Sequence, residues 1–186
     1  MGVWWGIHMI TLYPVTKKDF PNGKTVSYQY HSNSYYDVRM EQTAIGWNCT
    51  IQLQPLAQPF EKQLVEEIFE EYKKGSESYV AKWNKQEAAV IVFQKMDWNN
   101  TLLIHDLYVE ESFKNRGIGQ YLMNYVKQRA HEINVRAIVL ETQTSNVPAI
   151  QFYLKNGFAL VGLNTISYSN EDIKNKEVRI EMAYTM

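Results

Sequence analysis

Residues 106–119 read DLYVEESFKNRGIG, and the order of residue types in this stretch decides the fold. Leu107-Tyr108-Val109 ends an apolar run rich in residues that favour strands, and residues 110–115 form a short polar turn. From Ile118 onward apolar residues recur about every 3.6 positions, which predicts a helix over 118–133. The stretch therefore predicts a strand, a glycine loop and the first turn of a helix.

Such a loop is suited to binding phosphate. The first turn of a helix has unpaired N–H groups at the positive end of its dipole, and glycine lets the main chain approach a ligand closely. Gly117 and Gly119 supply the glycines, and Lys114 and Arg116 add two cations. Neither GxxxxGK[ST] nor the dinucleotide pattern GxGxxG is present, because Leu122 stands where the latter needs glycine.

Composition predicts one globular domain over residues 1–186, with residues 1–8 as a possible extension before an alternative start at Met9. The formal net charge of -1 gives no basic field for nucleic acid. No apolar run is long enough for a membrane span, and the N-terminus does not resemble a secretory signal. With Cys49 as the only cysteine and scattered histidines, we expect no disulfide, no metal site and a cytoplasmic protein.

The hydrophobic pattern predicts several antiparallel strands and one helix, followed by alternating strands and helices. This order indicates a mixed sheet with helices packed on it. Residues 26–30 and 35–40 are tyrosine-rich and fit either strands or a loosely ordered wall. The other expected strands cover residues 9–15, 47–53, 78–83, 87–93, 101–109, 136–142, 158–168 and 176–184, and the expected helices cover residues 60–74, 118–133 and 147–156.

The helix expected over residues 60–74 rests on apolar residues that would share one face, with glutamates outside and Gly75 just past its end. Pro55 and Pro59 are expected to end the preceding strand. The helix expected over residues 147–156 has Asn146 as its N-cap, Pro148 in its first turn and Gly157 beyond its end.

A second motif, LETQTSNVPAIQFYLKNGF at residues 140–158, follows the glycine loop at a distance of about 20 residues. Together the two motifs resemble the GCN5-related N-acetyltransferase superfamily, whose loop reads Q/R-x-x-G-x-G/A. Lys114 stands where that loop has Gln or Arg, but much of the phosphate binding in this family uses main-chain N–H groups. The resemblance implies a mixed α/β (α+β) fold with a largely antiparallel sheet, splayed at an acetyl-CoA site.

The likeness is closer to the streptothricin acetyltransferases, on the segments at residues 97–100, 140–143, 146–150 and 168–171. It covers residues 36–182, most clearly after Trp98. It implies transfer of an acetyl group from acetyl-CoA to the β-lysine amine of a cationic small molecule, with no nucleic acid, membrane or metal. A homodimer stays open as the assembly.

The resemblance also assigns residues to the cofactor. The main chain at Leu107, Tyr108 and Val109 would pair with the pantetheine arm. The pyrophosphate would lie on Lys114, Asn115, Arg116, Gly117, Ile118, Gly119 and Gln120, and Asn146 would hydrogen-bond the cofactor.

Two residues are candidates for the chemistry. Tyr153 resembles the family tyrosine near the sulfur, a general acid, although an aromatic at helical spacing is also a core residue. Glu141 ends an apolar strand, so it either pairs with a cation or acts as a general base through water. Asp106 is a rival base or an anchor for a second ammonium group.

A cationic acceptor calls for carboxylates and aromatic faces. The expected substrate contacts are Asp106, Tyr36, Asp37, Trp98 and Tyr168. Two other readings stay open: a protein lysine or N-terminal acetyltransferase, and a non-catalytic acyl-CoA-binding module.

Overall fold

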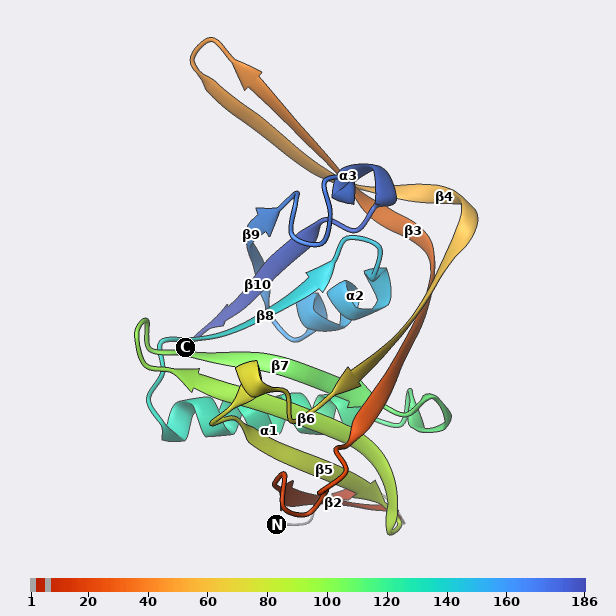
Figure 1. Cartoon of the computed structure of the whole chain (residues 1–186), viewed down its shortest axis with the longest axis vertical. Coiled ribbons are helices and arrows are strands. Elements are labelled where there is room, and N and C mark those ends of the chain that lie inside the picture. Colours follow the sequence, from red (N-terminus) through yellow and green to blue (C-terminus); the bar gives the residue numbers. More distant parts are fainter. Residues whose placement is uncertain (1–2, 6–7) are drawn as a thin grey trace. The chain divides into compact units, whose positions relative to one another are not determined.

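The computed structural model describes residues 3–5 and 8–186 (Figure 1). Its internal contacts divide the chain into two compact units, described separately below. The first holds the described residues up to 28, residues 64–140 and residues 185–186, and the second holds residues 29–63 and 141–184. A single domain over 1–186 stays a prediction, as does the start at Met9, and the extension 1–8 lies partly outside the described residues.

The first unit is built on a sheet with strand order β1-β2-β5-β6-β7-β8. Neighbouring strands are antiparallel except β7 and β8, which run parallel, so the expected mixed, largely antiparallel sheet is confirmed. The hairpin between β5 and β6 turns at Asn84-Lys85, whose φ angles of 49° and 73° suit a two-residue turn. The strands are β1 Val3–Trp5, β2 His8–Val15, β5 Glu77–Trp83, β6 Gln86–Met96, β7 Thr101–Val109 and β8 Ala137–Gln143.

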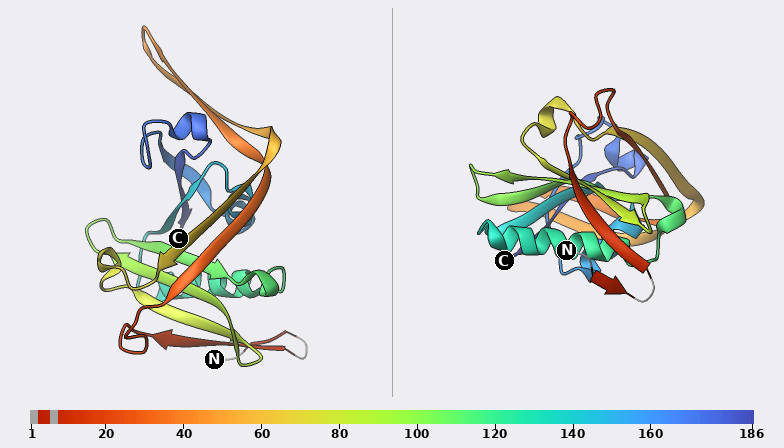
Figure 2. Two further views of the ribbon diagram at one scale, coloured as in Figure 1. Left: turned by 45° about the vertical axis from the view of Figure 1, so that its right-hand side comes forward. Right: turned by 90° about the horizontal axis from the view of Figure 1, so that it is seen from below.

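Helix α1, Ile118–Glu132, lies along one face of this sheet, as both views in Figure 2 show. Its apolar face is fully buried at Leu122 and Val126. Tyr125 packs edge-on against Tyr79 of β5, with the ring centroids 5.1 Å apart. The helix predicted from the 3.6-residue spacing is confirmed, and it fixes the loop before it against β6 and β7.

The other face of the sheet carries a second core. Val90 and Val92 of β6 alternate with Ile91 and Phe93, so they point away from α1. They pack with Val26, Ile68 and Val80, and Tyr28 and Tyr108 cover them. This cluster joins the start of β3 to β5, β6 and β7 of the same unit.

The second unit holds the end of β8, then β10 and β9 in that order. Asn146 caps α2 by accepting a hydrogen bond from the Ala149 N–H at 3.3 Å, as predicted. The further elements are α2 Val147–Lys155, β9 Ala159–Asn164, α3 Asp172–Asn175, β10 Arg179–Thr185, and most of the long strands β3 Thr25–Thr43 and β4 Gly46–Glu67.

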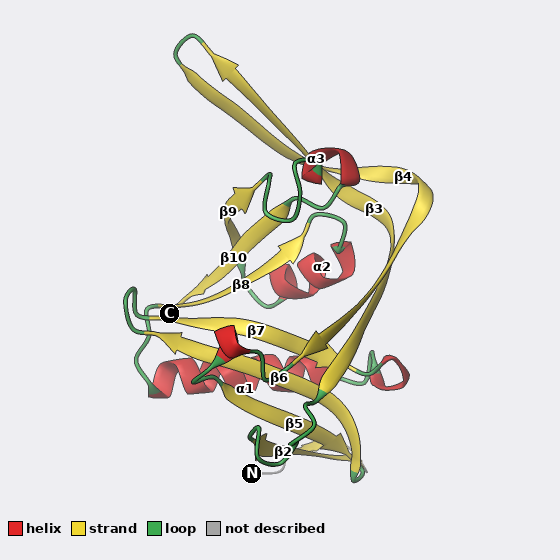
Figure 3. Cartoon of the chain, viewed as in Figure 1, coloured by secondary structure: helices red, strands yellow, loops and turns green. Residues whose placement is uncertain are grey.

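The helix predicted over residues 60–74 is wrong. The chain stays extended in β4 to Glu67, and only a short 3₁₀ turn, η1 Glu71–Lys73, follows (Figure 3). Exposure alternates along residues 60–65, a period of two, because the strand pairs with β3. Leu64 and Ile68 fit a period of two and a period of 3.6 equally, so long-range pairing overrode the helix propensity of the glutamates.

Pro55 and Pro59 do not end β4, contrary to expectation. In a two-stranded ribbon every second N–H points away from the partner strand, so a proline at such a position removes no ladder bond. Pro55 and Pro59 are both exposed and four residues apart, which puts them on the same side of the strand. The tyrosine-rich residues 26–40 are likewise continuous strand, in β3.

The C-terminal strands are shorter than predicted, and α3 between them was missed. Asp172 begins α3 and is buried, accepting hydrogen bonds from the Tyr168 N–H at 2.9 Å and the Ser169 hydroxyl at 2.8 Å. None of the described helices is long and apolar enough to cross a membrane.

Candidate functional site

The loop between β7 and α1 has the geometry of an anion site. Gly117 is the N-cap of α1 with φ 82° and, being a glycine, provides no side-chain cap for the first-turn N–H groups. A Cβ atom built on Gly117 would meet nothing within 4 Å, so the main chain there borders open space. Uncapped N–H groups at the positive end of a helix suit a phosphate group.

The charged side chains of the loop contact other residues of the loop. Lys114 pairs with Glu111 at 2.5 Å, and the Arg116 guanidinium lies over the Phe113 ring, 5.5 Å from its centroid. Asn115 adopts φ 60°, a left-handed conformation that asparagine tolerates. The predicted cofactor residues of the loop therefore lie together at one helix end.

Strand β7 parts from β8 before it reaches this loop. Their parallel pairing covers Thr101–Ala137, Leu102–Ile138 and Leu103–Val139. The register of β6 against β7 then shifts between the pairs Phe93–Ile104 and Val92–Asp106, which makes His105 the extra residue of a bulge. Bulges bend a strand and increase its twist, so the main chain of residues 107–109 is turned from β8 and open to another hydrogen-bonding partner.

Asp106 lies in a buried polar cluster and not in an open pocket. Its side chain is 4% exposed and accepts hydrogen bonds from Lys73 Nζ at 2.7 Å and from the Tyr28 hydroxyl at 3.0 Å. Lys73 is equally buried and also donates to the main-chain carbonyl of Glu67 at 3.1 Å. Burial lowers the pKa of Lys73, but the hydrogen bond and charge of Asp106 outweigh it and raise the pKa overall.

Trp98 is not near the segment at residues 107–109. It lies in the turn before β7 and its side chain is 81% exposed. Residues 101–107 of an extended strand span on the order of 20 Å, which separates Trp98 from Leu107. The structure thus does not bring Trp98 together with the predicted pantetheine segment.

In the second unit, Tyr153 of α2 is buried between aromatic rings. Its ring centroid lies 5.6 Å from that of Phe152 and 5.9 Å from that of Phe158. Burial raises the pKa of Tyr153 to about 12, so its hydroxyl group stays protonated at neutral pH. Tyr153 is therefore a core aromatic whose hydroxyl group carries its proton at neutral pH.

Asn146 begins the same helix. Its Oδ1 atom accepts the capping hydrogen bond from Ala149, which leaves the two Nδ2 protons as its donors toward a ligand. Sequence and structure agree on this cap, and the same side chain can also donate a hydrogen bond to a ligand.

Glu141 is half exposed, so the expected cost of burying it does not arise. Its carboxylate pairs with an Arg179 nitrogen at 2.7 Å, with 44% of its side chain exposed. Arg179 also pairs with Glu181 at 3.1 Å, while its buried Nε atom has no hydrogen-bond partner among the described residues. Tyr168 is held nearby in the same unit by a 3.3 Å hydrogen bond from Gln143.

Tyr36 and Asp37 lie on β3, whose main chain is fixed to the loop before α2. The Tyr36 N–H donates to the Thr144 carbonyl at 3.0 Å, and the Tyr36 hydroxyl accepts from Gln151 of α2 at 2.9 Å. Asp37 pairs with Arg39 at 2.8 Å. The structure therefore places Tyr36 beside α2, whereas Asp37 is engaged by its own strand.

Sequence reasoning missed Lys73, Tyr28 and Arg179. Lys73 looked like a cation in the last turn of a solvated helix, so no local pattern could have paired it with Asp106. Tyr28 lies 78 residues from Asp106. Arg179 was detectable in principle, since an expected carboxylate at a strand end needs a cation, but its position in the chain does not identify it.

Comparisons with known proteins identify the family and the fold. The family model described as "Acetyltransferase (GNAT) family" matches residues 47–158, more than half of the chain. Streptothricin acetyltransferase A of Bacillus subtilis (strain 168) is 32% identical over 82 residues, which are 44% of this chain and 47% of that protein. The chain thus matches about half the length of this curated relative.

Two solved structures resemble the whole chain. The crystal structure of nourseothricin acetyltransferase has a TM-score of 0.75 at 22% identity, covering 95% of this chain and 98% of the other. A protein of Bacillus anthracis (strain Ames), assigned as a streptothricin acetyltransferase and solved with acetyl coenzyme A, has a TM-score of 0.73 at 24% identity, covering 95% and 97%. At these identities the likeness establishes the fold.

Proposed function

We propose that this chain, which belongs to the acetyltransferase (GNAT) family, transfers the acetyl group of acetyl-CoA to the β-lysine amine of streptothricin-type antibiotics. The observation that carries the proposal is the uncapped, open helix end at Gly117, directly after a strand that has left its parallel neighbour. A relative named for streptothricin acetylation supports the choice of acceptor.

The cofactor site is proposed on three parts of the chain. The main chain of residues 107–109 would pair with the pantetheine amides, as an added strand would. The N–H groups of residues 115–120 would bind the pyrophosphate, with Lys114 and Arg116 as flanking charges. Asn146 would contribute its Nδ2 protons. The open space at Gly117 fits a bulky phosphate group approaching the main chain.

The reaction needs an uncharged amine, which attacks the thioester carbonyl; the C–N bond forms, the C–S bond breaks and the thiolate takes up a proton. We propose Tyr153 as the donor of that proton, because its raised pKa keeps it protonated. We propose Glu141 as the base that removes the proton of the amine through water. Its exposure gives water access, and Arg179 orients its carboxylate.

For the acceptor, we propose Tyr36 and Tyr168 as aromatic contacts and Asp37 as an outer negative charge. Asp106 is better explained as a positioning residue, because its oxygens already receive Lys73 and Tyr28. Trp98 is no longer proposed as a contact, since it is exposed at the far end of β7 from the pantetheine segment.

A thiol-release assay tests the proposal. The protein with acetyl-CoA should release thiol in the presence of streptothricin, with kcat/KM above that for free lysine, spermidine, an aminoglycoside or a ribosomal-protein peptide. A higher kcat/KM for the peptide would make the chain a protein acetyltransferase. No turnover with any amine, despite binding of acetyl-CoA, would make it an acyl-CoA-binding module.

A further inference from the structure

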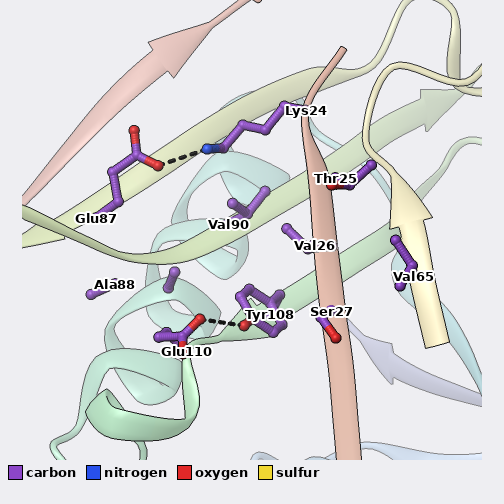
Figure 4. A pocket seen from close by; sticks show the side chains of 11 residues that line it. Lys24, Thr25, Val26, Ser27, Val65, Glu87, Ala88, Val90, Tyr108 and Glu110 are labelled. Atoms are coloured by element: carbon purple, nitrogen blue, oxygen red, sulfur yellow. Dashed lines mark hydrogen bonds and ion pairs between the residues drawn. The ribbon is translucent and has the colours of Figure 1, made fainter. Parts of the chain in front are cut away.

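The first unit contains a pocket of about 390 Å³ on the sheet face that is opposite α1 (Figure 4). This volume is within the range of about 300–1,000 Å³ typical of small-molecule sites. Its floor is apolar, formed by Val26 and Val90 and by the small residues Ala88 and Ala89. Exposed Val65 lies at its edge.

The polar groups of the pocket leave one negative charge unmatched. Lys24 pairs with Glu87 at 2.6 Å, and its Nζ atom also lies 4.7 Å from the centre of the Phe20 ring. Glu110 has no cationic partner among the described residues and accepts one hydrogen bond, from the Tyr108 hydroxyl at 2.6 Å. Two carboxylates and one ammonium group therefore line the pocket, and the unpaired charge is that of Glu110.

Tyr108 keeps the carboxylate of Glu110 as an acceptor. Burial raises the pKa of Tyr108, and its hydrogen bond to Glu110 raises it further, so the hydroxyl group stays protonated and donates. The Tyr108 ring packs edge-on against Tyr28 with centroids 5.4 Å apart, and the Tyr28 hydroxyl is anchored on buried Asp106. The side chain that donates to Glu110 is thus linked through Tyr28 to a buried carboxylate.

The pocket also adjoins the proposed cofactor strand. Tyr108 presents its side chain to the pocket, while its main chain is part of the segment proposed to pair with pantetheine. A ligand in the pocket would lie one strand away from that arm, because adjacent strands are about 4.8 Å apart. This closeness connects the pocket to the transfer reaction.

We propose that this pocket binds the second ammonium group and alkyl chain of a diamine acceptor, with Glu110 as the counter-ion. The proposal rests on the function proposed above. It gives the second ammonium group of the acceptor a binding site, which Asp106, the residue expected from the sequence, does not provide. The apolar floor accommodates methylene groups, and the carboxylate binds a cationic end of the ligand more tightly than a neutral or anionic end.

Steady-state kinetics test the proposal, because two variants should shift the KM for streptothricin in opposite directions. Glu110→Gln should raise KM for streptothricin about tenfold or more, with kcat and KM for acetyl-CoA within about twofold. Lys24→Met should lower the streptothricin KM, because it releases the carboxylate of Glu87. Glu71→Gln is the matched control, since Glu71 is exposed, pairs with exposed Lys74 and does not line the pocket. A streptothricin KM for Glu110→Gln equal to that of the control overturns the proposal.

A binding measurement separates this proposal from the proposed function. Calorimetric titration with cadaverine, a five-carbon diamine, needs no turnover. The wild type should bind cadaverine, and Glu110→Gln should bind it about tenfold more weakly or worse. If streptothricin is not acetylated but this difference is found, the function fails and the subsite stands. Equal cadaverine affinity, or no binding to the wild type up to about 10 mM, overturns the subsite.

Discussion

Replacing Lys73 with methionine should destabilise the protein strongly, because it leaves the buried carboxylate of Asp106 without its cation. The side chains of Lys73 and Asp106 are 2% and 4% exposed, and their atoms are 2.7 Å apart. Removing one partner of such a pair costs about 3–5 kcal/mol, since the remaining charge stays desolvated. Methionine has nearly the shape of lysine, so the loss reports the charge and its hydrogen bonds, not a cavity.

The assay is unfolding in urea followed by tryptophan fluorescence. A loss of about 3–5 kcal/mol corresponds to a fall in Tm of roughly 6–20 °C for a chain of this length. Lys74→Met is the control next in sequence, because its side chain is 82% exposed and pairs weakly with Glu71 at 3.5 Å. Its free energy of unfolding should stay within about 0.5 kcal/mol of the wild type.

A double variant distinguishes the effect of the unpaired carboxylate from other effects of the Lys73→Met substitution on stability. Lys73→Met combined with Asp106→Leu removes both charges, and should recover much of the stability that Lys73→Met loses. If Lys73→Met and Lys74→Met unfold at the same urea concentration, the buried pair does not contribute as described. The same conclusion follows if the double variant loses as much stability as Lys73→Met and Asp106→Leu lose together when each is made alone.

The pH dependence has a definite sign. The folded-state pKa of Lys73 is raised, so the stabilisation from its charge is complete below the ordinary lysine value of about 10.4 and is lost as pH rises through the folded value. The stability difference between wild type and Lys73→Met should therefore be constant from about pH 6 to 9 and shrink only above about pH 10. A difference that already disappears near neutral pH would refute this assignment.

Three further predictions concern the reaction. Gly117→Asp should weaken acetyl-CoA binding at least about tenfold by calorimetry, because of its negative charge and the cost of φ 82° for a side chain. Gly117→Asn, in which asparagine tolerates that angle, should bind acetyl-CoA more tightly than Gly117→Asp. Equal affinity of the wild type and both variants would remove the loop from the site. Tyr153→Phe should lower kcat about 10²–10⁴-fold with unchanged cofactor affinity, and since the pKa of Tyr153 is about 12, the wild-type kcat should not fall between about pH 8 and 10; turnover of Tyr153→Phe within twofold of wild type would make Tyr153 a packing residue. Glu141→Gln should lower kcat far more than KM, whereas an unchanged kcat would leave Glu141 as a partner of Arg179.

The parts of the site that lie close together in the chain could be predicted from the sequence. The strand ending at Val109, the loop and α1 follow one another within about 25 residues, and each carries its own signal in periodicity, glycine or cap. The same holds for Asn146 and α2. Local pattern failed at residues 60–74, where helix propensity and a period of 3.6 were both present. Pairing with β3, which no local window contains, decided that segment.

Asp106 shows why the remaining residues of the site could not be assigned. A carboxylate beside the cofactor strand fits substrate binding, catalysis and internal pairing equally well, and residue type does not choose among them. The choice depends on Lys73 and Tyr28, which are 33 and 78 residues away in sequence. Each oxygen of Asp106 already accepts one of these donors and the side chain is only 4% exposed, so the carboxylate is engaged inside the protein and not presented to an acceptor. Glu110 is its opposite: it is exposed, accepts a hydrogen bond from Tyr108 and has no cation partner among the described residues. Among the described residues that line the pocket, Glu110, four residues farther along the same chain segment, is therefore the carboxylate that has no cation partner and that we propose for the substrate.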